Sequence, residues 1–434
     1  MLLERMSWED FNALDQRRHR AGRSAHKLSR AQLLVGILFH YTVSWAGSFG
    51  EHLALLLKVT MAESSLSQRR QAVPFAVFEN MLGRLLRPLK EVPEAASYLG
   101  LRLVGIDGVE WSLVNTEQIN RTCPKASNHR GRAAFAKLRC AALVEVLMHN
   151  PLAARLGLEN ESEWKLAHQV LESVPEKCLL LADRLYGCGA FIVEAMKVLQ
   201  ARQGHFLIRI KQGLRVVRQI RRLQDGSQLV EIKALDQQNH HRIAQTMVVR
   251  EIQATVQRRG MKPVKVRLWT SLLDAQEAPA AELVRLYMSR WEQELYFREL
   301  KRELDVNDLL ASQTLETAAQ EVASMIIGSA LIAGKRASLR PGEELSHRIS
   351  FIKTWETLEP LWMTLLLGAD VLTDKQKQQL AERFYSFAGR RMMAKKRSRS
   401  CPRVVRRCMQ SWPCKRDQKS HQGPLRVHIL TTAA

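Results

Sequence analysis

The sequence lacks the paired cysteines of a disulfide-stapled protein. Its seven cysteines are odd in number and scattered along 434 residues, which argues for reduced thiols rather than a disulfide framework. Three of them, Cys401, Cys408 and Cys414, lie near His421 and raise the question of a zinc site. Structural zinc sites usually begin with two cysteines separated by about two to four residues, and that spacing is missing here. A zinc site in this segment is therefore the less favoured alternative to incidental cysteines.

A hydrophobic run long enough to cross a membrane is also missing. The most apolar early stretch, residues 33–45, is too short for a transmembrane helix and contains His40. The first 15 residues include Glu4, Glu9 and Asp10 and contain no apolar core of the secretory kind. These absences predict a protein without membrane segments that stays in the cytoplasm.

Acidic residues are scarce relative to basic ones. The chain has 66 Lys and Arg against 43 Asp and Glu, a formal net charge of +23 and a pI near 10.1. Such an excess implies a polyanionic partner, because neutralising phosphates releases condensed counterions and drives binding. Ribosome-associated proteins and proteins of anionic membranes share this property, but a nucleic acid is the favoured partner.

The pattern of apolar residues in the first half predicts a mixed α/β fold. Residues 1–95 indicate a helical N-terminal domain, whose basic stretch between Arg17 and Arg30 either contacts DNA or forms a solvated surface. The run 101–107, then Gly108 and residues 110–115, predicts a strand–turn–strand unit. Further strands are expected at about 138–148, 178–182 and 205–210, and helices at 162–173 and 189–202. Three early strands followed by alternating helices and strands describe a mixed sheet flanked by helices.

The second half begins with a strand-rich stretch and continues with helices. Residues 211–270 alternate short β-type runs with polar turns and predict a β-rich insertion. Residues 279–304 predict one long helix, because Pro279 lies near its start and no later Pro or Gly interrupts it. Further helices are expected at about 306–335 and 345–385. The basic stretch 390–416 contains no acid and predicts a tail that stays disordered until it meets phosphate.

Three acids stand out as candidates for chemistry. Asp107 and Asp183 each follow an apolar strand-like run, and ligand sites of α/β folds lie at such strand ends. In the predicted long helix, Tyr287, Glu294 and Lys301 recur every seven residues and share one stripe, with Arg290 about 60° to its side. Each residue also has an ordinary explanation. Asp107 would form a turn before Gly108, Asp183 would cap a helix, and Glu294 would pair with Arg290 or Arg298 four residues away.

The combination of these acids fits phosphodiester chemistry. Hydrolysis or transesterification of a phosphodiester uses two hard cations about 3.5–4 Å apart that clamp the attacking and leaving oxygens. Mg²⁺ prefers oxygen ligands and keeps some of its waters, so about three carboxylates suffice. Two acids at strand ends and one on a packed helix would provide such a site, and the basic surface would guide DNA towards it.

The spacing of the helix residues resembles a known signature. Tyr287-x2-Arg290-x3-Glu294-x6-Lys301 matches in full the Y-R-E-K signature of insertion-sequence transposases of the insertion-sequence-four family. The flanking words are similar as well: "VGIDGVEWSLVNT" resembles the first-aspartate motif, "LLLADRLYG" the second, and "LYMSRWEQELYFRELKREL" the glutamate helix. Looser similarity extends from "HRAGRSAHKLSR" and "SLSQRRQAVPFAVFENML" to "CPRVVRR" in the tail.

The resemblance implies a ribonuclease H-like catalytic domain at residues 96–385, with the β-rich insertion at 211–270 and a basic C-terminal tail at 386–434. By this resemblance Asp107, Asp183 and Glu294 would hold Mg²⁺, for which Mn²⁺ would substitute. Family members bind terminal inverted repeats, pair two ends in a dimeric complex, cleave them and join the 3′-hydroxyls to target DNA, in some cases through a hairpin. Tyr287, Arg290 and Lys301 would contact the DNA backbone or organise the site around Glu294.

Three points leave alternatives open. Relatives often have Pro-Asp where this chain has Val114-Asn115, so the surroundings of the first aspartate differ. Trp269 would stack on a displaced base, although a core tryptophan is the better explanation. Two other functions compete with transposition: a decayed transposase that only binds DNA, and a metal-dependent nuclease that cleaves without joining.

Overall fold

The structure is a computed structural model that describes residue 2 and residues 4–14, 28–43, 47–128, 131–158, 160–235, 243–257, 263–302, 309–339, 348–393, 404–405, 414–415 and 425–430. The chain forms two compact units. Unit 1 comprises Met1–Pro175 and Trp291–Met392, and unit 2 comprises Glu176–Arg290 and Met393–Ala434. The basic stretch 17–27, most of the basic tail, and Cys401, Cys408 and His421 lie outside the described residues.

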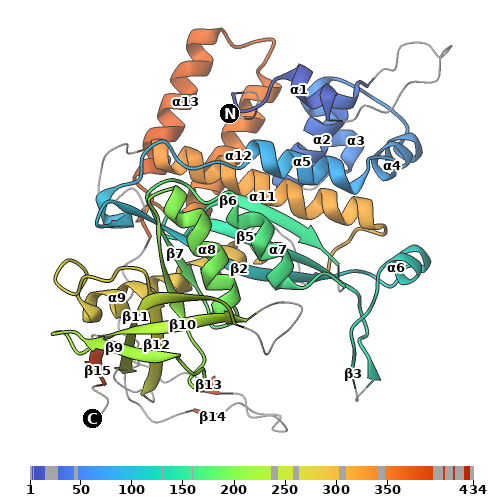
Figure 1. The fold of residues 1–434 in the computed structure, drawn as a ribbon. Coiled ribbons are helices and arrows are strands. Elements are labelled where there is room, and N and C mark those ends of the chain that lie inside the picture. Colours follow the sequence, from blue (N-terminus) through green and yellow to red (C-terminus); the bar gives the residue numbers. More distant parts are fainter. Residues whose placement is uncertain are drawn as a thin grey trace. The chain divides into compact units, whose positions relative to one another are not determined.

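Unit 1 begins with short helices that pack around one long helix. The early helices are α1 (Trp8–Ala13), α2 (Arg30–Thr42), α3 (Phe49–Leu57), α4 (Glu63–Gln71) and α5 (Phe75–Leu85). Ser7, Ser29 and Ser48 each accept a hydrogen bond from the backbone three residues on, and that residue's side chain bonds back to the serine. These reciprocal caps fix where α1, α2 and α3 begin. Helices α2 and α5 pack on α11 (Leu315–Ser338), which Figure 1 shows running past them.

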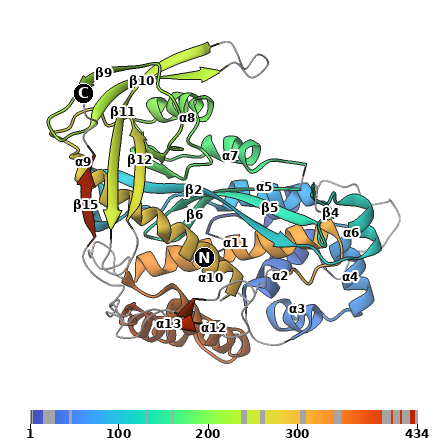
Figure 2. The same ribbon diagram turned by 90° about the horizontal axis from the view of Figure 1, so that it is seen from below.

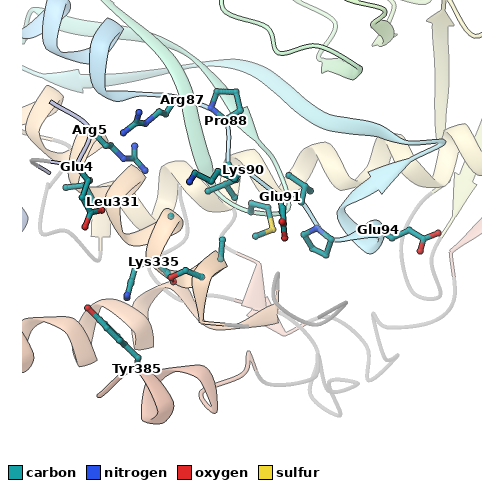
Figure 3. Close-up of a pocket in the computed structure, with 17 residues that line it drawn as sticks. Glu4, Arg5, Arg87, Pro88, Lys90, Glu91, Glu94, Leu331, Lys335 and Tyr385 are labelled. Atoms are coloured by element: carbon teal, nitrogen blue, oxygen red, sulfur yellow. The ribbon is translucent and has the colours of Figure 1, made fainter. Parts of the chain in front are cut away.

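Helix α11 is the core helix of unit 1. Among the described residues it alone is long and apolar enough to cross a membrane, but 83% of that apolar stretch is buried inside the protein. Helices α12 (Phe351–Leu367) and α13 (Asp374–Gly389) follow it and pack on each other. A cavity of about 1070 Å³ lies between the N-terminal segment, residues 87–94, α11 and α13 (Figure 3). Arg5, Arg87 and Lys335 face it together with Glu4 and Glu91, so its lining carries charges of both signs.

The strands of unit 1 are antiparallel and lie in the order β6-β5-β2. They are β2 (Leu101–Ser112), β5 (Lys137–Glu145) and β6 (Asn150–Gly157), and the short β1 (Ser97–Tyr98) pairs with β2. Between β2 and β5 lie α6 (Glu117–Thr122) and the hairpin of β3 (Ser127–Asn128) and β4 (Gly131–Arg132). Helix α7 (Glu163–Leu171) packs on β5, and Figure 2 shows α7 and α11 on opposite sides of these strands.

The strand–turn–strand prediction for residues 101–115 was wrong. β2 is one continuous strand, and Asp107 lies inside it, opposite Ala142 of β5, rather than at a strand end. Gly108 is not a turn residue. A Cβ atom at Gly108 would lie 2.2 Å from the Cδ atom of Glu163, so the missing side chain makes room for α7. The glycine therefore marks a close approach within a strand, a role that glycine also has in sheets.

Unit 2 contains a mixed sheet. β7 (Cys178–Ala182) is parallel to β8 (His205–Arg209), and α8 (Gly189–Ala201) connects them. The order continues β8-β12-β11-β10-β9 with antiparallel pairs. These four strands are β9 (Arg218–Arg222), β10 (Gln228–Leu235), β11 (Ile243–Gln257) and β12 (Val264–Thr270), and they fill the stretch in which strands were expected. The C-terminal strand β15 (Arg426–Ile429) adds to β11, a pairing that the basic composition of the tail did not predict.

The prediction of one uninterrupted helix over 279–304 was also wrong. The segment forms α9 (Ala280–Tyr287), a 3₁₀ turn at Met288–Arg290 and α10 (Trp291–Arg302). The Ser289 hydroxyl donates to the Leu286 carbonyl oxygen at 2.5 Å, a back-bond that competes with the helical pattern. Because a 3₁₀ turn advances about 120° per residue, Tyr287 and Glu294 do not keep the stripe expected for an ideal helix. The mixed α/β class itself is confirmed by the strands and helices of both units.

Candidate active site

In unit 1 a single glutamine joins the glutamate helix to the strand of the first aspartate. The Gln293 side-chain amide donates to the Ala142 carbonyl oxygen at 3.1 Å. Ala142 is the residue of β5 directly opposite Asp107. Gln293 immediately precedes Glu294 and is fully buried. The helix turn that carries Glu294 is thus attached to the sheet at the level of Asp107.

Gly105 shows which face of β2 the helix covers. A Cβ atom at Gly105 would lie 2.1 Å from the Gln293 Oε1 atom, so this face of the strand looks towards α10. Residues two apart on a strand share a face. Asp107 therefore points to the side of β2 that α10 covers, whereas Gly108 points to the side that α7 covers. Asp107 and Glu294 are both partly exposed, and Asp107 Oδ1 accepts a hydrogen bond from the Gly108 N–H at 2.9 Å.

Lys301 lies farther along the same face. Its Nζ atom is 5.8 Å from the ring centroid of Trp111, whose side chain is 1% exposed. Trp111 lies four residues after Asp107 on β2 and therefore on the same face of the strand. Cation–π contacts extend to about 6 Å, so this is a weak but real anchor for the lysine stem. Helix α10 therefore runs along β2, with Gln293 near Gly105 and Lys301 near Trp111.

In unit 2 the second aspartate shares its surroundings with the first half of the signature. Asp183 directly follows β7, as predicted, and its Oδ1 atom accepts a hydrogen bond from the Leu185 N–H at 2.7 Å. The Tyr287 hydroxyl donates to the Ala182 carbonyl oxygen at 3.2 Å. Tyr287 is 4% exposed, and burial raises its pKa to about 12. Arg290 and Arg209 lower this pKa and Asp183 raises it, which places their charges near the phenol.

The signature thus contributes Tyr287 and Arg290 to unit 2, and Glu294 and Lys301 to unit 1. The three candidate carboxylates are divided in the same way, with Asp107 and Glu294 in unit 1 and Asp183 in unit 2. Within the described ranges, no group of three or more His, Cys, Asp or Glu side chains is close enough to hold a metal ion. As a donor set, the three carboxylates nevertheless offer the oxygen ligands that Mg²⁺ prefers.

The sequence analysis missed two residues near the candidate site, Gly105 and Gln293. It explained a third residue, Trp269, correctly. Gly105 and Gln293 carry no motif of their own, and only the packing of α10 on β2 reveals them. Trp269 is a core residue. It is 1% exposed and donates from Nε1 to Glu251 Oε2 at 2.8 Å, so its ring is not available to stack on a base.

Comparison with known proteins assigns the chain to a family. A family described as "Transposase DDE domain" matches residues 100–327, more than half of the chain. The chain belongs to this family of transposases. InsG, the transposase of insertion sequence element IS4 in Escherichia coli strain K12, is 26% identical over 353 residues, or 80% of this chain and 77% of InsG. The mixed α/β class that the resemblance implied agrees with both units, each of which combines strands with helices.

A solved structure is also similar. It is a piggyBac transposase synaptic complex with hairpin DNA, determined by cryo-electron microscopy, with 8% sequence identity and a TM-score of 0.44 over 91% of this chain and 83% of that chain. Transposases with the matched domain depend on divalent metal ions. Family membership supports DNA transposition as the process in which this transposase acts.

Proposed function

We propose that this transposase binds the terminal inverted repeats of its element, cleaves DNA strands there and joins the 3′-hydroxyl ends to target DNA. The observation that carries the proposal is the Gln293 bond to Ala142. It attaches the turn carrying Glu294 to the strand pair in which Asp107 lies, on the face of β2 towards which Asp107 points. Carboxylates that are brought close together repel each other unless cations or protons compensate, so we assign Asp107 and Glu294 to a cation site.

The proposed ligands are Asp107, Asp183 and Glu294. Their carboxylates suit Mg²⁺, with Mn²⁺ as a substitute. Bound in this way, the ions would stabilise the charge that develops on the attacking and leaving oxygens of the phosphodiester. The chain's own contribution is to orient the ligands. The Gly108 N–H donates to Asp107 Oδ1, and the Leu185 N–H donates to Asp183 Oδ1, so a backbone hydrogen bond restrains the rotamer of each aspartate.

The other signature residues have different roles. Buried Tyr287 donates to the carbonyl oxygen next to Asp183, so it organises the end of β7. Arg290 and Lys301 are partly exposed cations, and we assign them to the DNA backbone, where each would neutralise a phosphate. The Trp111 ring beneath the Lys301 ammonium would limit its motion without removing its charge.

The remaining assignments follow from charge and family. Double-stranded DNA, as element end and as target, is the partner that matches a net charge of +23. We propose that residues 1–95 form a helical DNA-binding domain, that residues 96–385 are catalytic with the insertion at 211–270, and that the basic tail 386–434 contacts phosphate. Assembly on DNA ends would be homodimeric, and the protein would act in the cytoplasm without a membrane.

The decisive experiment is strand cleavage and joining by wild type and Glu294→Gln. The substrate is a labelled duplex that carries the end sequence of the element, supplied with Mg²⁺ and target DNA. Glu294→Gln removes one charge and almost no volume, so it should abolish cleavage while end binding persists. Glu282→Gln is the control, because Glu282 is an exposed glutamate on the preceding helix α9.

Each outcome separates one function from the others. Cleavage and joined products from wild type and Glu282→Gln, with none from Glu294→Gln, support the transposase. Cleavage without joined products indicates a nuclease. End binding without cleavage by any of the three proteins leaves a DNA-binding protein that has lost catalysis, and contradicts the proposal.

A further inference from the structure

A buried histidine contacts the glutamate helix from the side opposite Glu294. His149 lies in the turn between β5 and β6, is 4% exposed and has a left-handed backbone with φ of 50°. Its Nδ1 atom is 2.6 Å from Glu299 Oε2, and its Nε2 atom is 3.4 Å from Glu292 Oε2. Both ring nitrogens thus face carboxylates of α10, and one side chain bridges two turns of that helix.

The helix geometry places this bridge behind Glu294. Glu292 and Glu299 are seven residues apart and lie within about 20° of each other around the helix axis. Glu294 is two residues after Glu292 and therefore points about 200° away. Lys301 shares the direction of Glu294. The His149 bridge consequently fixes the rotation of α10 about its axis while leaving the Glu294 face untouched.

The surroundings of the bridge are charged and buried, which is costly unless the groups are paired. Arg336 of α11 is 1% exposed and donates to the carbonyl oxygen of Met148, the neighbour of His149. Its charge also faces Glu292 and Glu299. Burial lowers the pKa of His149, but Glu299 and Glu292 outweigh that effect and raise the pKa above its ordinary value. The two acids therefore face a histidine whose proton they favour and a buried arginine.

A second anchor acts at right angles to the bridge. Gln293 points about 100° from both Glu292 and Glu294 and bonds to Ala142, as described above. Two attachments in different directions leave α10 neither free to rotate nor free to slide along β2. A nonpolar helix interface would allow both motions more easily, because apolar contacts lack direction.

We propose that His149 is a positioning residue: by bridging Glu292 and Glu299 it holds α10 in the rotation that presents Glu294 to the metal site. The inference rests on the proposed role of Glu294 as a ligand. His149 itself touches neither DNA nor metal. Its loss should therefore weaken the metal site while leaving DNA binding intact.

The test measures the Mg²⁺ concentration that gives half-maximal cleavage of the labelled end duplex. His149→Gln removes the bridging imidazole ring, and Glu299→Gln removes the charge of one bridged carboxylate with almost no change in volume. Both are expected to raise the half-saturating Mg²⁺ concentration by about tenfold, the lower end of the effect of removing a direct partner of a metal ligand, because they act on Glu294 only through the helix. End binding, measured without metal, should stay within about twofold of wild type.

The control is His52→Gln. His52 is a histidine of unit 1 that is 3% exposed and lies in α3, with its Nδ1 atom 2.9 Å from that of His40. It loses the same ring from a buried site remote from α10, so the half-saturating Mg²⁺ concentration should not move. Thermal unfolding of all variants verifies that they are folded at the assay temperature, and Glu299→Gln provides the test if His149→Gln is not.

The outcomes distinguish this inference from the proposed function. If wild type cleaves and both His149→Gln and Glu299→Gln keep the wild-type Mg²⁺ dependence, only the positioning role is overturned. An equal shift in His52→Gln also overturns it, because general loosening would then explain the result. Equal cleavage by wild type and Glu294→Gln would instead contradict the ligand role that the proposed function gives to Glu294.

Discussion

At the scale of single residues, Gly105 is a position on β2 where no side chain fits without displacing its neighbours. A Cβ atom there would lie 2.1 Å from Gln293 Oε1 and 2.7 Å from Val146 Cγ1. Both neighbours are fully buried, and the Gln293 amide is already committed to Ala142. Relief therefore requires α10 or the β5–β6 turn to move.

We accordingly expect Gly105→Ala to lower the free energy of unfolding by about 1–3 kcal/mol, the usual effect of overpacking. Cleavage should fall by more than this loss explains, because the displaced turn carries Glu294. Urea denaturation and the cleavage assay measure the two effects. Gly83→Ala in α5 is the control, since a Cβ atom there meets nothing within 4 Å, and it should raise stability by at most about 1 kcal/mol. Equal effects of the two substitutions would contradict the role assigned to Gly105.

At the scale of elements, the sequence predicts best where the physical pattern is local. The apolar run before Asp183 became the buried strand β7, and the helical spacing of residues 162–173 became α7 with Ser162 as its N-cap. The prediction failed at Gly108 and Ser289. A glycine after an aspartate usually indicates a turn, and only the approach of Glu163 from α7 explains why it lies within a strand here. The 3₁₀ turn coincides with a hydrogen bond from the Ser289 hydroxyl to the Leu286 carbonyl oxygen, which the apolar periodicity of the sequence does not reveal.

The candidate site shows the same division. Spacing and resemblance were enough to select the acids and the four signature residues, because these patterns consist of residues close together in the sequence. His149 and Gln293 were not selected, since their partners lie about 150 residues away in the sequence: His149 with Glu299, and Gln293 with Ala142. Contacts of that separation follow from the fold and leave no mark in composition or periodicity.

Helix α9 has an anchor of its own in unit 2. Arg250 of β11 is fully buried and pairs with Asp225, whose carboxylate also accepts from the Ala280 N–H at the start of α9. The Arg250 guanidinium further donates to the Leu272, Asp274 and Ala278 carbonyl oxygens, which lie in the segment leading into the helix. One side chain thus fixes where α9, with Tyr287 at its end, begins.

Arg250→Met should therefore destabilise unit 2 by about 3–5 kcal/mol, because it removes the cation paired with Asp225 and the donor to several buried carbonyl oxygens. Chemical denaturation measures the loss, and hydrogen exchange should accelerate first in α9. Arg218→Met is the comparison: Arg218 pairs with Glu231 at 2.7 Å, but its side chain is 71% exposed, so the loss should stay below about 1 kcal/mol. Similar losses for the two variants would mean that Arg250 is not an anchor.

At the scale of the whole molecule, the basic charge and a buried histidine both make the fold less stable in acid. The excess of Lys and Arg favours DNA but repels itself, increasingly so as acids become protonated at low pH. His40 in α2 adds to this acid sensitivity. Burial, together with Arg70 and His52, lowers its pKa to about 3, and its Nδ1 atom lies 2.9 Å from that of His52. The folded protein thus keeps His40 neutral at a pH at which the unfolded chain protonates it.

The sign of the resulting pH dependence is fixed by this lowered pKa. Above pH 6.5, the pKa of His40 in the unfolded chain, neither the folded nor the unfolded state binds the proton, so His40 does not change the free energy of unfolding. Below this pH only the unfolded state binds the proton, so the free energy of unfolding decreases until about pH 3. His40→Phe removes the titration and keeps a ring. Between pH 7.5 and pH 5 it should reduce the loss of unfolding free energy by up to about 2 kcal/mol relative to wild type. Denaturation curves at the two pH values measure this, with His428→Gln as the control because His428 is exposed on β15. Parallel pH profiles for wild type and His40→Phe would show that His40 binds its proton equally well in both states, which its burial against α3 argues against.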